Sequence, residues 1–140
     1  LTLASIVEKE TGVEAERGLV AAVFRNRLKR QMPLQSDPTV IYGLKDFNGN
    51  LTKKDLRDDN PYNTYRINAL PPGPICNPSL SSIKATLNPA DVPYLYFVSK
   101  NDGTHAFSET IEEHNRAVKP YQPVREPAHG QNKKALAKRR

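Results

Sequence analysis

The sequence has little of what would place it in several large classes of proteins. It contains one cysteine, Cys76, one methionine and no tryptophan in 140 residues. A single cysteine excludes an internal disulfide and a thiolate-rich metal site, and we expect Cys76 to be a structural thiol. There is no apolar run of about 18 residues, so no segment is expected to cross a membrane. The chain starts inside an apolar helical pattern without a methionine or a signal-like segment, which suggests a fragment of a longer protein.

Positive charge is present but unevenly distributed. The formal net charge is +6, and residues 125–140 carry six Lys or Arg against one Glu, which is +5, so the other 124 residues carry only +1. We therefore predict a domain over residues 1–121 and a basic, flexible tail over residues 122–140. Attraction of the tail to an acidic polymer or anionic lipid is the less favoured interpretation, and no nucleic-acid partner is expected.

Hydrophobic periodicity and turn residues predict an α+β fold. In it, N-terminal helices pack on a small antiparallel sheet and long loops carry the function. The threonine and glutamate pairs at 11/14 and 110/113 have the spacing of capping boxes. Prolines exclude a helix from residues 33–38. Helices are expected over residues 1–10, 14–30, 52–56, 79–87 and 110–119, and a hairpin over residues 94–98 and 104–107.

Glu10 is the candidate catalytic residue. At 100° per residue it lies in the apolar stripe of the first helix, one turn beyond Ile6 and Val7, whereas Glu8 points roughly 160° away. A carboxylate buried there needs a cation, hydrogen-bond donors or a proton. With a proton, Glu10 becomes a candidate general acid. The alternative is a helix-end carboxylate whose stem packs while its head reaches water.

The segment 58–78 is almost without periodicity, and a structureless loop of this length in a small domain is usually functional. It is rich in Asn, Tyr and Thr, which hydrogen-bond neutral hydroxyls, and it has neither a P-loop nor a cluster of Arg, so it favours a carbohydrate over a nucleotide. His105, His114 and His129 are too dispersed for a metal site, and no cofactor is expected. His105 is either a sheet residue or a donor in a ligand cleft. Asp37 is either a turn residue or the second carboxylate of a glycosidase.

Six motifs, in order along residues 1–121, resemble those of the YceG-like family. They are LASIVEKE at 3–10, LQSDPTV at 34–40, YNTY at 62–65, LPPG at 70–73, YLYFV at 94–98, and His105-x-Phe107 with His114-Asn115. The resemblance implies an endolytic lytic transglycosylase that cleaves the MurNAc–GlcNAc β-1,4 bond of peptidoglycan glycan strands without water and leaves 1,6-anhydro-MurNAc ends. It also implies a parent protein anchored at the periplasmic face of the bacterial inner membrane, with peptidoglycan synthases as further partners.

The resemblance assigns the catalytic role to the second glutamate of Glu-Lys-Glu, Glu10, as general acid and then base. Around it we expect substrate contacts from Gln35, Asp37, Asn63, Tyr65, Asn77, His105 and Phe107. Three other functions stay open. They are a hydrolytic muramidase that pairs Asp37 with Glu10, a noncatalytic glycan-binding module, and a nucleic-acid binder that acts through the tail.

Overall fold

A computed structural model describes residues 1–121 of the protein, and the predicted tail lies outside them. The described residues form six α-helices, one 3₁₀ helix and a two-stranded antiparallel sheet, which confirms the α+β prediction. In chain order they are α1 (Thr2–Glu10), η1 (Glu14–Glu16), α2 (Arg17–Lys29), α3 (Asp37–Gly43), α4 (Lys53–Leu56), α5 (Leu80–Leu87), β1 (Tyr96–Ser99), β2 (His105–Ser108) and α6 (Ile111–Tyr121).

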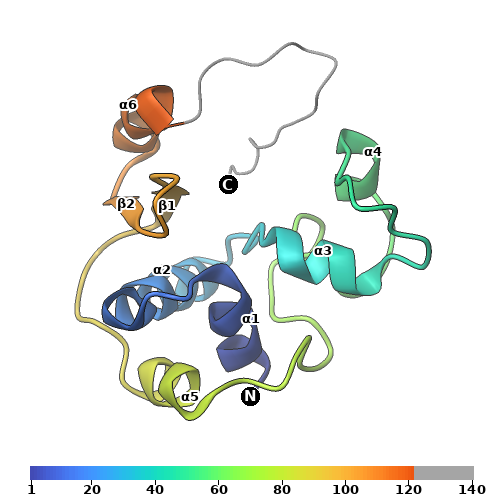
Figure 1. Ribbon diagram of the computed structural model, residues 1–140, viewed down its shortest axis with the longest axis horizontal. Coiled ribbons are helices and arrows are strands. Elements are labelled where there is room, and N and C mark those ends of the chain that lie inside the picture. Colours follow the sequence, from blue (N-terminus) through green and yellow to red (C-terminus); the bar gives the residue numbers. More distant parts are fainter. Residues whose placement is uncertain (122–140) are drawn as a thin grey trace.

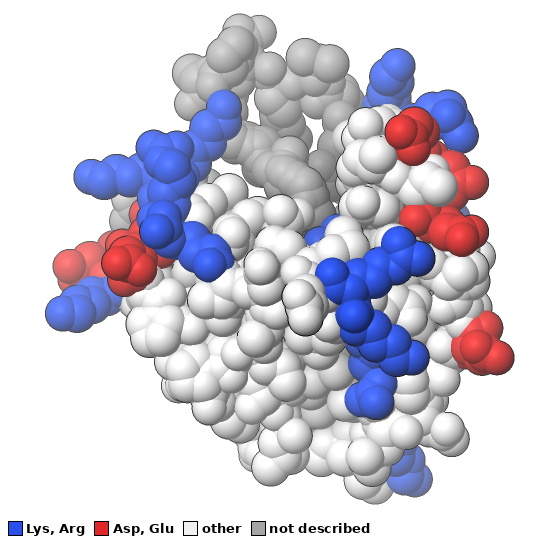
Figure 2. All heavy atoms as spheres, turned by 180° about the vertical axis from the view of Figure 1, so that it is seen from behind, with Lys and Arg blue, Asp and Glu red and all other residues white. Residues whose placement is uncertain are grey.

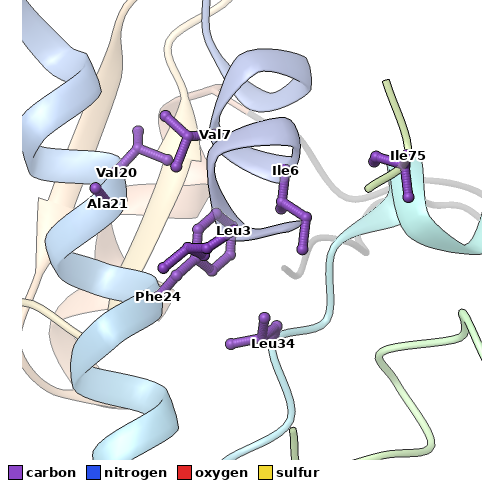
Figure 3. Packing of buried hydrophobic residues seen from close by; sticks show 8 residues of the cluster. All are labelled: Leu3, Ile6, Val7, Val20, Ala21, Phe24, Leu34 and Ile75. Carbon is purple, nitrogen blue, oxygen red and sulfur yellow. The ribbon is translucent and has the colours of Figure 1, made fainter. Parts of the chain in front are cut away.

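The hydrophobic core lies between α1 and α2, and α5 packs against both helices (Figure 1). Apolar residues recur at helical spacing in α1 and α2, so each helix buries one stripe against the other. The last two members of the cluster come from loops: Leu34 precedes α3, and Ile75 lies between α4 and α5 (Figure 3). The cluster consists of Leu3, Ile6, Val7, Val20, Ala21, Phe24, Leu34 and Ile75.

The hairpin lies at the other side of α2 and is packed beneath α6 (Figure 1). Its register pairs Tyr96 with Ser108 and Ser99 with His105. Phe97 of β1 meets Phe24 of α2 edge to face, with ring centroids 5.8 Å apart, a geometry that aromatic pairs favour. This contact joins the sheet to the helical core, so that β1 and β2 stand beside the C-terminal half of α2.

Predictions of local turn chemistry are confirmed in some places and wrong in two. The Thr110–Glu113 capping box is present, since the Thr110 hydroxyl accepts from the Glu113 N–H and the Glu113 carboxylate accepts from the Thr110 N–H. The Thr11–Glu14 box is wrong, because the Thr11 hydroxyl accepts from the N–H of Val13 instead. The exclusion of a helix from residues 33–38 is also wrong, since α3 begins at Asp37. Proline is tolerated in a first helical turn, where its missing N–H would have no partner in the helix.

Charged side chains on the face opposite to that of Figure 1 gather in separate groups, with Asp and Glu beside Lys and Arg in two of them (Figure 2). Much of the remaining surface in that view is uncharged. No helix within residues 1–121 is long and apolar enough to cross a membrane.

Candidate functional site

A pocket of about 90 Å³ opens where the end of α1, the middle of α2, the segment before α3 and the hairpin meet. Three of the predicted site residues, Glu10, Gln35 and His105, line it together although they are far apart in the sequence. Ligand pockets for whole small molecules are several times larger, so this volume fits a substituent of a ligand. The other lining residues are Val23, Phe24, Arg27, Leu34, Leu95, Tyr96, Phe97, Val98 and Ser99.

Glu10 is the last residue of α1, and its carboxylate contacts the segment that precedes α3. The Ser36 hydroxyl donates to Glu10 Oε2 over 2.6 Å, and the Ser36 side chain is itself buried. Glu10 is half-buried, and so is Glu8 on the other side of the helix, so burial does not distinguish the two glutamates. One carboxylate oxygen of Glu10 is therefore anchored at the pocket wall by a neutral donor.

Two buried threonines fix the backbone of Ser36. The Thr64 hydroxyl accepts from the Ser36 N–H at 2.9 Å, and the Thr39 hydroxyl donates to the Ser36 carbonyl at 2.7 Å. The two hydroxyls are 2.8 Å apart. Either hydroxyl can be the donor between them, because each also lies within hydrogen-bond distance of the Ser36 carbonyl. Both backbone groups of Ser36 are thus held by the loop after α4 and by the first turn of α3.

Gln35, immediately before Ser36, has a left-handed backbone with φ of 53°. This region is uncommon for a residue with a Cβ and costs about 1–2 kcal/mol. The Gln35 N–H donates to the Thr64 carbonyl at 3.2 Å, so the loop compensates part of this cost. Strained backbone of this kind is often found at functional sites.

Arg27 brings a buried positive charge to the pocket. Its Nε donates to the Leu95 carbonyl and its Nη1 to the Pro33 carbonyl, both at 2.7 Å, and its guanidinium lies 5.0 Å from the centre of the Tyr96 ring. Burial lowers the pKa of Arg27 from its ordinary value, and the neighbouring Tyr96 and Tyr65 act against this shift. An arginine nevertheless stays protonated at neutral pH. Arg27 ties the hairpin to the segment before α3 through these two carbonyls.

His105, the first residue of β2, is held by a residue that the sequence analysis did not single out. The Glu16 carboxylate of η1 lies 2.8 Å from His105 Nδ1 through Oε1, and its Oε2 accepts from the His105 N–H at 3.0 Å. Both side chains are nearly buried, at 10% exposure for His105 and 13% for Glu16. The Phe97 ring meets the imidazole edge to face at 5.3 Å. His105 is therefore both a sheet residue and a residue of the pocket.

Asp37 and Tyr65 form a pair beside this pocket. The Tyr65 hydroxyl donates to Asp37 Oδ1 at 2.5 Å, and Tyr65 is close enough to Arg27 to affect the guanidinium pKa. Asp37 also stands in the first turn of α3, where a carboxylate is favoured by the helix dipole. Neither residue lines the pocket, but Asp37 directly follows Ser36, whose hydroxyl donates to Glu10.

Three other predicted contacts lie elsewhere. Asn63 is completely buried, and its amide donates to the carbonyls of Leu56 and Asp58, so we withdraw it from the set of sugar contacts. Asn77 is exposed before α5 and does not line the pocket. Phe107 packs on the core cluster and stacks on Tyr94 at 5.8 Å, so its ring serves the fold.

Glu8, on the opposite side of α1, has a structural partner. Its carboxylate accepts from the N–H of Ser79 at 2.9 Å and from the hydroxyl of Ser82 at 2.8 Å, at the start of α5. Hydrogen bonds from the Ser79 side chain and backbone and from Ser82 lower the pKa of Glu8 to about 2. Glu8 is thus a charged cap for α5, and the two glutamates of the motif have separate surroundings.

The site contains four residues that sequence reasoning missed or read differently. Ser36 lies in the motif at 34–40 and Arg27 in the predicted second helix, but neither was expected to serve the site. Glu16 and Thr64 meet their partners across 89 and 28 residues, separations at which local periodicity gives no signal. Within residues 1–121, no three His, Cys, Asp or Glu side chains come together as metal ligands.

Comparison with known proteins decides the family. The model of the YceG-like family matches residues 1–120. The chain belongs to the YceG-like family. The motifs from which the resemblance was inferred all lie within the matched residues, so that prediction is confirmed.

Two curated relatives in the family carry the name endolytic murein transglycosylase. The protein from Bacillus subtilis is 47% identical over 121 residues, which are 86% of this chain and 34% of that protein. The protein from Streptococcus pneumoniae is 39% identical over 124 residues, which are 84% of this chain and 22% of that one. The chain thus spans about a third of the length of the first relative and less than a quarter of the second.

A solved structure of a family member has the same fold. It is a yceG-like protein from Listeria monocytogenes, 49% identical, with a TM-score of 0.77 over 82% of this chain and 38% of that one.

Proposed function

We propose that this YceG-like domain is an endolytic lytic transglycosylase of peptidoglycan. It would cleave the β-1,4 bond between MurNAc and GlcNAc within a glycan strand and leave 1,6-anhydro-MurNAc ends. The observation that carries the proposal is the position of Glu10, a half-buried carboxylate anchored by Ser36 at the wall of a small pocket. The names of two relatives more than a third identical support the substrate and the reaction type.

The proposed mechanism uses one carboxyl group twice. Glu10, protonated, donates its proton to the glycosidic oxygen as the bond breaks through an oxocarbenium-like state. The carboxylate then takes the proton of the muramoyl C6 hydroxyl, whose oxygen attacks C1 of the same sugar. Because this nucleophile is intramolecular, its effective concentration is already high and a second carboxylate is not required.

The geometry suits this division of roles. Ser36 donates to Oε2 of Glu10 and so helps to fix the orientation of the carboxyl group. Arg27 lines the same pocket and brings a positive charge to it. Gln35 lines the pocket and would contact a neighbouring sugar group, and the hydrogen-bonded pair Asp37–Tyr65 is a candidate for a further contact outside the pocket.

Product analysis is the direct test. Purified murein is digested with the protein, and the masses of the products are measured by mass spectrometry. A product with an anhydro end is lighter by one water than the same product with a reducing end. We expect anhydro ends. Reducing ends would favour the hydrolytic muramidase in which Asp37 assists Glu10, and a protein that binds murein without cutting it would be a glycan-binding module.

The role of Glu10 is tested by Glu10→Gln, which keeps the size of the side chain and removes its acidity. We expect the rate of end formation to fall by about a hundredfold or more, with little change in thermal unfolding. Glu14→Gln is the matched control, because Glu14 is an exposed carboxylate in η1. Retained cleavage by Glu10→Gln would refute the assignment.

We also propose that the domain acts at the periplasmic face of the inner membrane in a membrane-anchored parent protein, near the synthases that make its substrate. Support comes from the substrate itself, which lies outside that membrane. Protease treatment of intact spheroplasts gives the test: degradation of this domain is expected, and full protection would place it inside.

A further inference from the structure

Glu16 and His105 are joined by two polar contacts, which side-chain packing alone does not require. Glu16 uses both carboxylate oxygens on a single residue, Oε1 on the imidazole and Oε2 on the N–H of the same histidine. The two residues come from η1 and β2, and their side chains are nearly buried together. Such a two-point contact fixes both the position and the rotation of the imidazole ring.

This contact also selects the tautomer of His105. A carboxylate at neutral pH accepts hydrogen bonds and cannot donate one, so the proton between the two groups resides on His105 Nδ1. In the neutral ring Nε2 then carries a lone pair, on the edge of the ring opposite Glu16. Within residues 1–121 no hydrogen bond is formed by Nε2. Nε2 is also not one of the buried side-chain nitrogen or oxygen atoms that lack a hydrogen-bond partner in this part of the chain. His105 lines the pocket that Glu10 also lines.

We infer that Glu16 is a positioning residue that presents His105 Nε2 as a hydrogen-bond acceptor for a neutral donor of the glycan. The inference rests on the proposed function for the identity of the ligand. Two groups of the glycan supply this chemistry, the N–H of an acetamido group and a sugar hydroxyl. The pocket, with a volume of about 90 Å³ and apolar side chains such as Phe24 and Leu34 beside the polar ones, fits a substituent of either kind.

The tautomer is measured directly by NMR on the whole protein. Nitrogen-15 shifts and long-range proton couplings distinguish a ring protonated on Nδ1, on Nε2 or on both. We expect the Nδ1–H form in the wild type at neutral pH, although free histidine favours Nε2–H. A wild-type ring in the Nε2–H or the doubly protonated form would overturn the inference, whether or not murein is the substrate.

Glu16→Gln tests the link to the substrate. Its amide N–H can donate to Nδ1 and so move the ring proton to Nε2. In the Glu10→Gln background, where turnover is suppressed, we expect binding to purified murein to weaken about fivefold to tenfold. Glu14→Gln, two residues away in η1, is the matched control and is expected to bind as the parent does. Unchanged binding by the Glu16 variant would sink the inference.

A second pair of variants keeps the test decisive where Glu16→Gln lowers the melting temperature. His105→Gln retains an acceptor oxygen near the position of Nε2, and His105→Phe retains none, so we expect His105→Gln to bind murein more tightly than His105→Phe. Equal binding by the two would contradict the acceptor role. If the wild type itself fails to bind or cut murein, the proposed function fails separately, and the NMR result still decides the tautomer.

De-N-acetylated murein identifies the donor. If the acetamido N–H is the donor, removing the acetyl groups weakens binding of the parent much more than binding of Glu16→Gln. If a hydroxyl is the donor, both proteins respond to de-N-acetylation alike while the difference between them persists. Loss of that difference on every substrate would mean that Glu16 acts only in the fold.

Discussion

Ser36 makes the contact to Glu10 on which the proposed chemistry depends. Ser36→Ala removes the hydroxyl that donates to Oε2 of Glu10 and so weakens the orientation of the carboxyl group. We expect the rate of anhydro-end formation to fall on the order of tenfold, since hydrogen bonds to charged groups are worth about 1.5–3 kcal/mol. Initial rates on purified murein provide the measurement.

Ser36→Thr is the companion variant, because it keeps the hydroxyl at the same position. It is expected to recover most of the lost rate. A Ser36→Ala protein as active as the wild type would show that the hydroxyl is not needed to orient Glu10.

At the level of single residues, the sequence predicted Glu10, Gln35 and His105 as members of one site, and the structure brings them together. The first followed from helical periodicity, which is a local property. Asn63 shows the limit of this reasoning: an asparagine in a loop can bind a sugar, or it can satisfy the carbonyls of its own loop. Composition does not distinguish these two uses, because both need the same amide.

Among the elements, α5 depends on a charge supplied by another helix. The pKa of Glu8 is about 2 rather than 4.5, owing to the hydrogen bonds from Ser79 and Ser82. A lowered pKa in the folded state means that the contact stabilises the protein above about pH 4.5, and that this contribution is lost as the pH falls towards 2.

Glu8→Gln should therefore lower the free energy of unfolding by about 1 kcal/mol near neutral pH, a value reduced for the partial access of solvent. The difference from the wild type should vanish in strong acid. Urea denaturation at several pH values checks this. A constant difference across that range would argue against the charge as its source.

The end of α3 has no room for a side chain at Gly43. A Cβ there would lie 2.1 Å from Asn60 Oδ1, and the Asn60 side chain is tied to Asp58 and to the N–H of Tyr62. Gly43→Ala should destabilise the protein by about 1–3 kcal/mol, because overpacking must displace a hydrogen-bonded side chain. Thermal unfolding measures the loss. Gly12→Ala is the control, since nothing lies within 4 Å of its Cβ position, and equal losses in both variants would exclude the clash as the cause.

Element boundaries followed from the sequence where the signal was local. The helices predicted over residues 52–56 and 79–87 are present. Thr52 caps α4 and Ser79 caps α5, and such a cap needs only residues three positions apart. The packing of the hairpin on α2 and α6 was not predictable in this way. It depends on contacts such as Arg27 with the Leu95 carbonyl, 68 residues away.

For the molecule as a whole, the division into a domain over residues 1–121 and a basic tail stays a prediction. The family model covers residues 1–120, and the residues before 125 carry a net charge of only +1. Deleting residues 125–140 should leave the melting temperature and the cleavage of murein unchanged. It should also abolish any binding to duplex DNA at low salt, since such binding depends on basic side chains. Calorimetry, end-group analysis and a salt titration test the three statements, and a shortened chain that no longer cuts murein would disprove the domain boundary.

The left-handed turn at Gln35 carries a last consequence. Three successive residues there serve three different neighbours: Gln35 the pocket, Ser36 the carboxyl group of Glu10, and Asp37 the phenol of Tyr65. Adding or removing one amino acid in this stretch would move each of these three side chains by one position. Each neighbour would then face a different side chain. We therefore expect evolution to have varied the identity of the surrounding residues far more freely than the length of this segment.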